Sequence, residues 1–351
     1  MRRNLLEILR CPSCKSGDLE LDVHADSELE VSEGTVACDH CRRQWSVNDG
    51  IVDMLVAPPE VTKLETNGRA RFVEDTRRTM PMDDEWLLGL PESAFHVPAG
   101  KNRDFVDNLS ALSEVAGFGE GSRLLDIGAG NCWASWRLAA RGASVVAVDV
   151  SRVKYEGLES GAVQIAGHGQ YFDRVLGEME NLPFDDESVD GCLFYATLHH
   201  SHDLRLAFAE SARVLRPGGV VLAIHEGVSG MLRNNRLLGI RSVHEVDWQK
   251  YNWNEQVFPL HTYIRAAKEA GLAHKLMLPP FVERRLERRE FDGLLFGRIA
   301  AVAALAWRLP GGRSLLRSKA AVVAASYLVG LPLTAVFRKT PSGRTCGPGN
   351  D

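Results

Sequence analysis

The stretch that decides the fold is Arg123-Leu-Leu-Asp-Ile-Gly-Ala-Gly-Asn-Cys-Trp133, followed by Val145-Val-Ala-Val-Asp149. Its apolar beginning predicts a short buried strand of a parallel sheet. Gly128 and Gly130 then let the backbone turn tightly and approach a ligand, because glycine has no Cβ. The second apolar strand ends in Asp149, where an acid can bind the two hydroxyls of a ribose. Together they predict half of a doubly wound α/β sheet that binds a nucleotide.

Two features of the turn argue against a dinucleotide. A dinucleotide-binding fold expects a third glycine at position 133, where this chain has Trp133. Asp126 lies inside the turn, where its charge would repel the diphosphate of NAD and attract the sulfonium and amino groups of S-adenosylmethionine. The segment resembles motif I of the class I S-adenosylmethionine-dependent methyltransferases.

The sequence after Asp149 extends this resemblance to the broad type 11 group of these enzymes. The matching motifs are Leu182-Pro-Phe184, Leu198-His-His200 and Leu215-Arg-Pro-Gly-Gly219. The resemblance implies a Rossmann-like methyltransferase sheet, with Glu178 and Met179 placed to contact the adenine. The residues that it implies for binding S-adenosylmethionine are Asp126, Gly128, Gly130, Asp149, Glu178, Met179 and Tyr195.

The candidates for a general base follow the fourth and fifth predicted strands. Methyl transfer is an in-line displacement, and it needs a base when the acceptor carries a proton that ionises late. We take His199 as the first candidate, because a neutral imidazole suits this role; the alternative is a structural or cofactor-flanking role. The chain has no Asn-Pro-Pro-Tyr here, which argues against methylation of an adenine or glutamine amino group. The full set of candidates is His199, His200, His202, His225 and Glu226.

Two C-x2-C pairs, Cys11-Pro-Ser-Cys14 and Cys38-Asp-His-Cys41, precede this domain and are separated by 23 residues. Four thiolates on two tight turns can close a tetrahedral zinc site of the structural kind, with no open position for chemistry. A degenerate ribbon without metal is the alternative. The stretches around these pairs resemble the small zinc-ribbon proteins that activate tRNA and release-factor methyltransferases. Paired cysteines and the lack of a secretory signal pattern favour a reducing, cytoplasmic compartment.

The tail is basic and apolar. Residues 281–340 contain 11 Arg and Lys against 4 Asp and Glu, in a chain with a net charge of −5. Residues 299–307 are apolar, and residues 320–337 carry no charge. This pattern predicts two helices in a hairpin over 299–339 that lie on an anionic membrane surface, as a peripheral contact at the inner face. The alternative is a helical pair packed on the catalytic domain or on a second subunit.

These patterns predict five segments along the chain. They are a zinc ribbon at 1–57, a helical linker or lid at 58–120, the methyltransferase domain at 121–280, the helical hairpin at 281–340 and a disordered tail at 341–351. Within them, residues 86–103 are the candidate lid. Residues 226–253 form a variable insertion. Its arginines contact either a substrate anion or solvent: Arg233, Arg236 and Arg241. Its aromatic residues line either a pocket or the core: Trp248, Tyr251 and Trp253.

The sequence therefore predicts an enzyme that transfers a methyl group from S-adenosylmethionine to a small or lipid-linked acceptor, with zinc in a structural role. The alternative is an RNA methyltransferase acting on rRNA or tRNA, with the ribbon as its RNA-binding module. The net negative charge makes a nucleic-acid partner the less favoured reading. A non-enzymatic binding scaffold is a third class, and the intact motif I argues against it.

Overall fold

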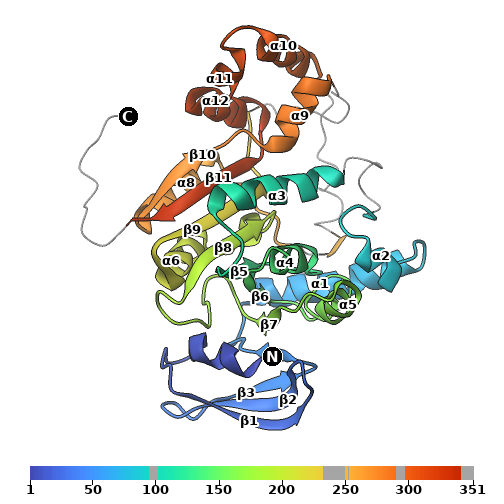
Figure 1. Cartoon of the computed structure of the whole chain (residues 1–351), viewed down its shortest axis with the longest axis vertical. Coiled ribbons are helices and arrows are strands. Elements are labelled where there is room, and N and C mark those ends of the chain that lie inside the picture. Colours follow the sequence, from blue (N-terminus) through green and yellow to red (C-terminus); the bar gives the residue numbers. More distant parts are fainter. Residues whose placement is uncertain (95–101, 232–249, 252, 290–296, 341–351) are drawn as a thin grey trace.

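A computed structural model describes residues 1–94, 102–231, 250–251, 253–289 and 297–340, and its strands join in one twisted sheet (Figure 1). The sheet contains eleven strands among the described residues, in the order β1-β2-β3-β4-β7-β6-β5-β8-β9-β11-β10. The strands are β1 Leu19–Asp26, β2 Val31–Cys38, β3 Gln44–Asn48, β4 Ile51–Asp53, β5 Arg123–Ile127, β6 Ser144–Asp149, β7 Asp173–Leu176, β8 Val189–Tyr195, β9 Leu215–Glu226, β10 Leu272–Leu276 and β11 Leu333–Lys339.

Helices cover both faces of the half of the sheet that contains β5 to β11. This arrangement confirms the doubly wound Rossmann-like sheet that the sequence predicts. Strands β7, β6, β5, β8 and β9 are parallel. In this half of the sheet, β11 runs antiparallel to both of its neighbours, β9 and β10. The helices are η1 Arg3–Ile8, α1 Glu60–Arg77, α2 Asp84–Leu88, α3 Arg103–Ala116, α4 Trp133–Ala139, α5 Ser160–His168, η2 Leu198–His200, α6 Leu204–Val214, α8 Leu260–Glu269, α9 Pro280–Arg288, α10 Gly297–Arg308, α11 Gly312–Leu316 and α12 Lys319–Val329.

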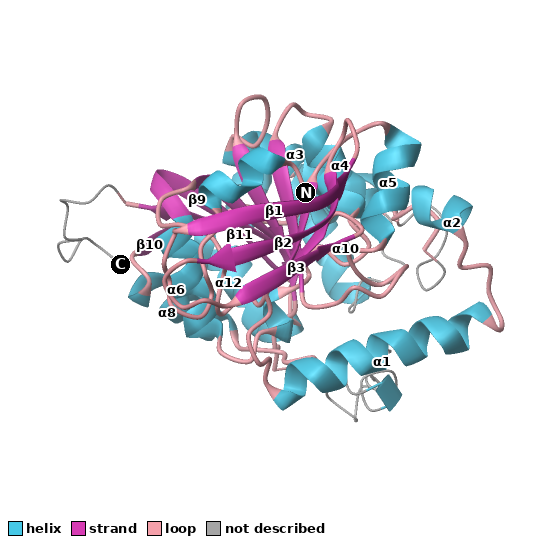
Figure 2. Ribbon diagram, turned by 90° about the horizontal axis from the view of Figure 1, so that it is seen from below, coloured by secondary structure: helices cyan, strands magenta, loops and turns pink. Residues whose placement is uncertain are grey.

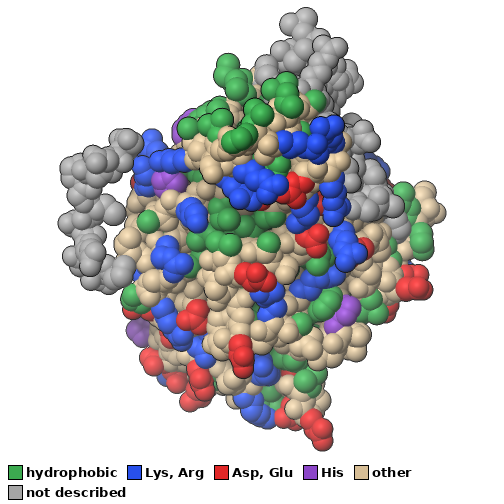
Figure 3. Space-filling model, turned by 45° about the horizontal axis from the view of Figure 1, so that its top comes forward, with side chains coloured by type: hydrophobic (Ala, Val, Ile, Leu, Met, Phe, Trp, Pro, Cys, Tyr) green, Lys and Arg blue, Asp and Glu red, His purple; other side chains and the backbone are tan. Residues whose placement is uncertain are grey.

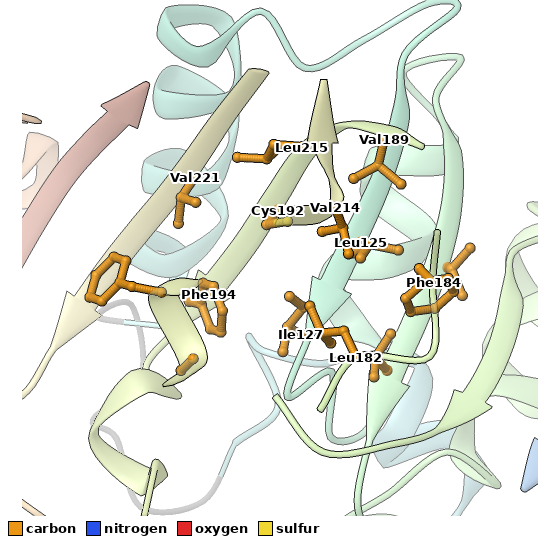
Figure 4. Close-up of a cluster of buried hydrophobic side chains, with 14 of the residues drawn as sticks. Leu125, Ile127, Leu182, Phe184, Val189, Cys192, Phe194, Val214, Leu215 and Val221 are labelled. Atoms are coloured by element: carbon orange, nitrogen blue, oxygen red, sulfur yellow. The ribbon is translucent and has the colours of Figure 1, made fainter. Parts of the chain in front are cut away.

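Alternate residues of the central strands enter two separate cores. Leu124 and Val145 face the core that contains side chains of α3, α4 and α5. Leu125 and Val146 face the opposite core, which contains side chains of α6, α8 and α12 (Figure 4). Parallel strands buried on both faces need apolar residues at nearly every position, which is why Leu124, Leu125 and Ile127 are apolar in β5.

The ribbon continues the sheet of the larger domain, a connection that the sequence does not predict. β4 pairs with β7 in parallel register, with Val52 opposite Val175, and the hairpin strands β1 to β3 follow outward from β4. Figure 2 shows these three strands, seen from below, crossing in front of the larger sheet. A second attachment joins η1 to the loop before β8, where the amide of Arg10 donates to the carbonyl of Pro183 at 3.0 Å.

A buried ion pair accompanies this strand pairing. Arg174 on β7 is 1% exposed, and its Nη2 donates to Oε1 of Glu30 at 2.8 Å and to the carbonyl of Asp49 at 3.0 Å. Glu30 lies in the turn between β1 and β2. Burial would raise the pKa of its carboxyl, but the charges of Arg174 and of the amino terminus outweigh burial and lower this pKa.

The structure corrects the predicted second helix of the tail. The uncharged run at 320–337 is not one helix: α12 ends at Val329, and Leu333–Lys339 is strand β11, inserted between β9 and β10. Gly330 stops the helix in the left-handed conformation at φ +65°, and Pro332 cannot continue it. Residues 333–337 are buried in the sheet. Helices α9 to α12 therefore form an insertion before the last strand, and residues 333–339 belong to the sheet.

Several predicted features fall outside the described residues. They are the arginines Arg233, Arg236 and Arg241, Trp248, part of the 86–103 lid and the 341–351 tail. None of the helices in the described part of the chain combines the length and the apolar character needed to cross a bilayer.

We predict that Arg174→Ala lowers the free energy of unfolding by about 2 to 3 kcal/mol, because it leaves the half-buried Glu30 carboxylate without its main charged partner. Arg3→Ala is the matched control, since Arg3 pairs with Asp26 at 2.6 Å while both side chains are largely exposed. It should cost less than about 1 kcal/mol. Urea denaturation measures both values, and equal costs would contradict the importance of the buried pair.

Candidate functional site

A cavity of about 690 Å³ lies at the carboxyl end of the parallel strands, where open α/β sheets bind their ligands. Helix α1, which lies along this edge of the molecule in Figure 2, covers it. The side chains of α1 that line the cavity recur at intervals of three or four residues and so share one face of the helix: Val61, Thr62, Glu65, Arg69, Phe72 and Thr76. The wall opposite α1 comes from the turns after β5, β6, β7 and β8.

The glycine turn after β5 brings its backbone close to the cavity. Gly128 has φ +71°, and a Cβ there would lie 2.0 Å from Cγ2 of Thr197, so only glycine fits. Asp149, at the end of β6, is buried and accepts hydrogen bonds from the amides of Gly130 and Ser151, each at 2.8 Å. Its carboxylate lines the cavity beside the turn. This arrangement fits the ribose and methionine portions of S-adenosylmethionine.

Asp126 lies in strand β5, two residues before Gly128, rather than inside the turn, and it is not among the residues that line the cavity. It is 2% exposed, and its Oδ2 accepts a hydrogen bond from Oγ of Ser135 on α4 at 2.5 Å. Burial raises the pKa of Asp126 to about 7, and the nearby charge of Asp149 adds to the increase, whereas the Ser135 hydrogen bond opposes it. A cation placed next to Asp126 would stabilise its charged form, in keeping with a sulfonium or ammonium ligand.

The other predicted cofactor residues surround the same cavity. Met179 and Tyr195 line it, and the Tyr195 hydroxyl donates to the carbonyl of Phe105 at 3.2 Å. Glu178 is buried beside the cavity, and its Oε1 accepts a hydrogen bond from Oγ1 of Thr62 at 3.2 Å. This hydrogen bond links α1 to the turn after β7. A contact between Glu178 and adenine stays a prediction.

His199 lies between two carboxylates. Its Nδ1 is 2.9 Å from Oε2 of Glu226, which is fully buried, and its Nε2 is 3.3 Å from Oε2 of Glu255. Burial would lower the pKa of His199, but hydrogen bonds to Glu226 and Glu255 raise it to about 9. Without a bound metal ion, an imidazole in this environment holds a proton at neutral pH. This environment disfavours the neutral general base that the sequence suggests.

His200 lines the cavity and faces α1. Its Nδ1 lies 3.1 Å from Oε1 of Glu65, an ion-pair distance outside hydrogen-bond geometry. Arg69 donates to the same oxygen of Glu65 at 2.9 Å. Burial would raise the pKa of Glu65, but Arg69 and His200 outweigh burial and lower it to about 2. Glu65 is therefore charged at neutral pH, between a guanidinium and an imidazole.

The remaining histidine candidates lie elsewhere. His202 is at the rim of the cavity, with Nδ1 3.2 Å from Oε1 of Glu180. His225 is not among the residues that line the cavity. Its ring packs between Phe105 on α3 and Phe281 on α9, with each centroid separation 5.5 Å. The structure thus brings His199 and His200 together and separates His225 from them.

Cys11, Cys14, Cys38 and Cys41 converge at the end of the ribbon hairpin. Sγ of Cys11 lies 3.6 Å from that of Cys41, and Sγ of Cys14 lies 3.6 Å from that of Cys38. A zinc ion bound at about 2.3 Å by four sulfurs separates them by roughly 3.8 Å. The four thiols therefore fit one tetrahedral zinc ion.

The sequence does not single out the acidic and basic residues of α1 or Glu255 as parts of the site. Glu65 and Arg69 belong to a charged segment without strand alternation, and such segments are usually solvated. Their spacing of four residues, with Phe72 one turn further on, is the signal that places them on one face with an apolar neighbour. Glu255 carries no local signal, because its position depends on how the chain returns to the sheet.

Comparison with known proteins identifies two modules. Residues 125–223 match the family described as methyltransferase domain, and residues 2–50 match the family described as Trm112p-like protein. An uncharacterized methyltransferase of Mycobacterium tuberculosis is 37% identical over 124 residues, which are 35% of this chain and 46% of that protein. A demethylmenaquinone methyltransferase of Clavibacter sepedonicus is 40% identical over 113 residues, 32% of this chain and 42% of that protein. In both cases the chain spans less than half of the relative's length.

Among solved structures, the chain is similar to a complex that contains the Haloferax volcanii Trm112 methyltransferase activator. The sequence identity is 16%, the match covers 82% of this chain and all of the other, and the TM-score is 0.42.

We predict that Asp149→Ala weakens the binding of S-adenosylhomocysteine roughly 10- to 100-fold, because hydrogen bonds to a charged group are lost. Isothermal titration calorimetry measures the change. Asp190→Ala is the matched control, because Asp190 also accepts a hydrogen bond from a backbone amide, that of Arg123 at 2.7 Å, but does not line the cavity. An unchanged affinity in Asp149→Ala would refute the assignment of the cofactor site.

Proposed function

Residues 125–223 are a methyltransferase domain and residues 2–50 a Trm112p-like zinc ribbon; from this premise we propose that the chain methylates a small amphipathic acceptor at a membrane surface. S-adenosylmethionine would supply the methyl group. Gly128, Gly130 and Asp149 would hold it at one side of the cavity. The cavity itself is the observation that carries the proposal, since 690 Å³ is in the range of sites for small molecules.

The part of the cavity next to α1 suits an acceptor with an apolar body. Phe72 and Met80 line it from the side of α1, and Trp253 lines it from the returning chain. Phe72 packs edge-on against Trp253, with ring centroids 5.1 Å apart. Relatives whose names refer to demethylmenaquinone and to biotin biosynthesis agree with a small-molecule acceptor.

The insertion α10–α12 supports contact with a membrane. Val302 and Leu305 on α10 and Leu309 just after it follow helical spacing and are 59–69% exposed, and Leu315 on α11 is 63% exposed. Hydrophobic side chains gather near the top of the molecule, with Lys and Arg side chains beside them (Figure 3). Basic residues on or next to these helices include Arg308, Arg313, Arg317 and Lys319.

Charge indicates which surface would cover this apolar face. Two of its arginines are partly neutralised from α9: Arg313 lies 3.4 Å from Glu287, and Arg317 lies 2.6 Å from Glu283. The basic residues still outnumber these acids. Exposed apolar side chains rimmed by cations are typical of proteins that lie on anionic lipid. We therefore take an anionic membrane surface as the partner of this face.

The ribbon gives little support to the alternative RNA substrate. Residues 1–57 contain 6 Arg and Lys against 11 Asp and Glu, a net charge of −5. A nucleic-acid clamp needs a basic surface to neutralise phosphates.

Methyl-labelled S-adenosylmethionine and a fractionated extract of the source cells test the proposed acceptor class. We expect label in lipid or small amphipathic material with the wild-type protein, and none with Asp126→Ala, which removes the carboxylate behind the cofactor turn. Label in RNA would contradict the proposal and make the ribbon the substrate-binding module. Label that persists in Asp126→Ala would refute the role given to motif I.

The membrane contact has its own test. We predict that wild-type protein co-floats with vesicles containing phosphatidylglycerol at low salt, and that Leu305→Glu reduces the bound fraction several-fold. Leu206→Glu is the matched control, since Leu206 on α6 is 47% exposed but lies outside this face. Equal vesicle binding by both variants would refute the assignment. A change of oligomeric state in Leu305→Glu, without any vesicle binding by the wild type, would show that a second copy covers the face.

A further inference from the structure

Two histidines and a glutamate converge at the wall of the cavity. Nε2 of His199 lies 3.3 Å from Oε2 of Glu255, and Nε2 of His200 lies 3.7 Å from Oε1 of the same carboxylate. One ligand atom from each of the three side chains lies within 4.8 Å of the others. We propose that this trio binds one divalent transition-metal ion, and that the ion holds an oxygen atom of the methyl acceptor.

The spacing of the ligand atoms fits a single ion. Imidazole nitrogen and carboxylate oxygen bind zinc at about 2.0–2.2 Å, which separates two ligands of one ion by roughly 3.0–3.5 Å. The two observed separations lie in or close to this range. Two histidines and one carboxylate also leave coordination positions open, as in metal sites that bind a substrate.

A second carboxylate lies beside each imidazole. Nδ1 of His199 lies 2.9 Å from Glu226 and is hydrogen-bonded to it, whereas Nδ1 of His200 lies 3.1 Å from Glu65, an ion-pair contact outside hydrogen-bond geometry. Histidines that bind metals usually donate their other ring N–H to a carboxylate, which fixes the tautomer and the ring plane. Glu226 can orient the His199 ring in this way, and both rings have Nε2 on the side of Glu255.

The position of Glu255 is fixed by its two neighbours in the chain. The Asn254 side chain donates to the carbonyl of His200 at 2.6 Å, and the amide of Gln256 donates to the carbonyl of His199 at 2.8 Å. The residues on both sides of Glu255 thus form hydrogen bonds to the backbone of the two histidines. A site held in this way needs little rearrangement when a ligand binds.

Carboxylates surround the two imidazoles. Glu65, Glu226 and Glu255 bring three carboxylates to the two imidazoles, and Arg69 is bound to Glu65. A divalent ion would lie next to oxygen ligands of the kind that it binds. The competing explanation is that the imidazoles pair with the carboxylates without a metal.

The site deepens the proposed function by indicating a substrate class. His200 and Glu255 line the same cavity as Gly128 and Asp149, so a bound ion would lie near the methyl donor. Its open positions would take hydroxyl or carboxylate oxygens of the acceptor. This role in acceptor binding rests on the proposed methyl transfer, whereas metal binding itself does not.

The test titrates the full-length, zinc-loaded protein with Mn²⁺ and detects free Mn²⁺ by electron paramagnetic resonance. Mn²⁺ is the probe because it prefers oxygen and nitrogen ligands to the thiolates of the ribbon. We expect one bound Mn²⁺ per wild-type chain, and at least tenfold weaker binding in Glu255→Gln and His200→Ala. His202→Ala is the matched control and should bind Mn²⁺ as the wild type does, since His202 lies outside the trio.

A measurement on the wild-type protein alone guards against variants that fail to fold. Substoichiometric Mn²⁺ should broaden the imidazole NMR signals of His199 and His200 before that of His274. The proposal is overturned if neither Mn²⁺ nor a second equivalent of Zn²⁺ binds, or if the control variant loses as much binding as the others. Titration of the same preparation with S-adenosylhomocysteine reports separately on the cofactor site, so failure of the metal site and failure of the proposed function are distinguishable.

Discussion

The parallel pairing of β4 with β7 is the interaction on which the arrangement of the site depends. It joins the ribbon to the methyltransferase sheet and sets where the chain leaves the ribbon, because Asp53 lies opposite Leu176 at the carboxyl edge. Helix α1 begins seven residues later and crosses that edge. Its Thr62 bonds to Glu178 just after β7, and its Glu65 reaches His200 after β8. The ribbon therefore positions the helix that covers the cavity.

The site itself is a set of charges removed from water and balanced against one another. Arg69 lies among Glu65, Asp149 and Glu156; burial would lower the pKa of its guanidinium, but these acids raise it. Burial raises the pKa of Glu156 to about 7, even though Arg69 opposes this effect. Leaving any one of these groups without its partner would be costly in such surroundings. This explains why α1, which has a polar sequence, is nonetheless held against the cavity.

The sequence predicts the parts of this structure whose chemistry is local. The glycine turn, Asp149 and the four cysteines each carry a short pattern with one physical meaning, and the structure places them as expected. It does not predict strand β11, because an uncharged run such as 320–337 suits a buried helix and a buried strand equally well. It also misses the β4–β7 pairing and the position of Glu255. These depend on contacts between residues more than 50 apart in the chain, which no local pattern encodes.

The most direct test of the account is hydrogen–deuterium exchange of the protein with zinc bound and after zinc removal by a chelator. A zinc ion held by the four thiols would stabilise the ribbon hairpin, which would support β4 and so position α1. The account predicts that zinc removal accelerates exchange together in β4, β7 and α1, with weaker binding of S-adenosylhomocysteine. Faster exchange confined to β1, β2 and β3, with unchanged cofactor binding, would contradict it and show that the ribbon and the catalytic cavity are independent.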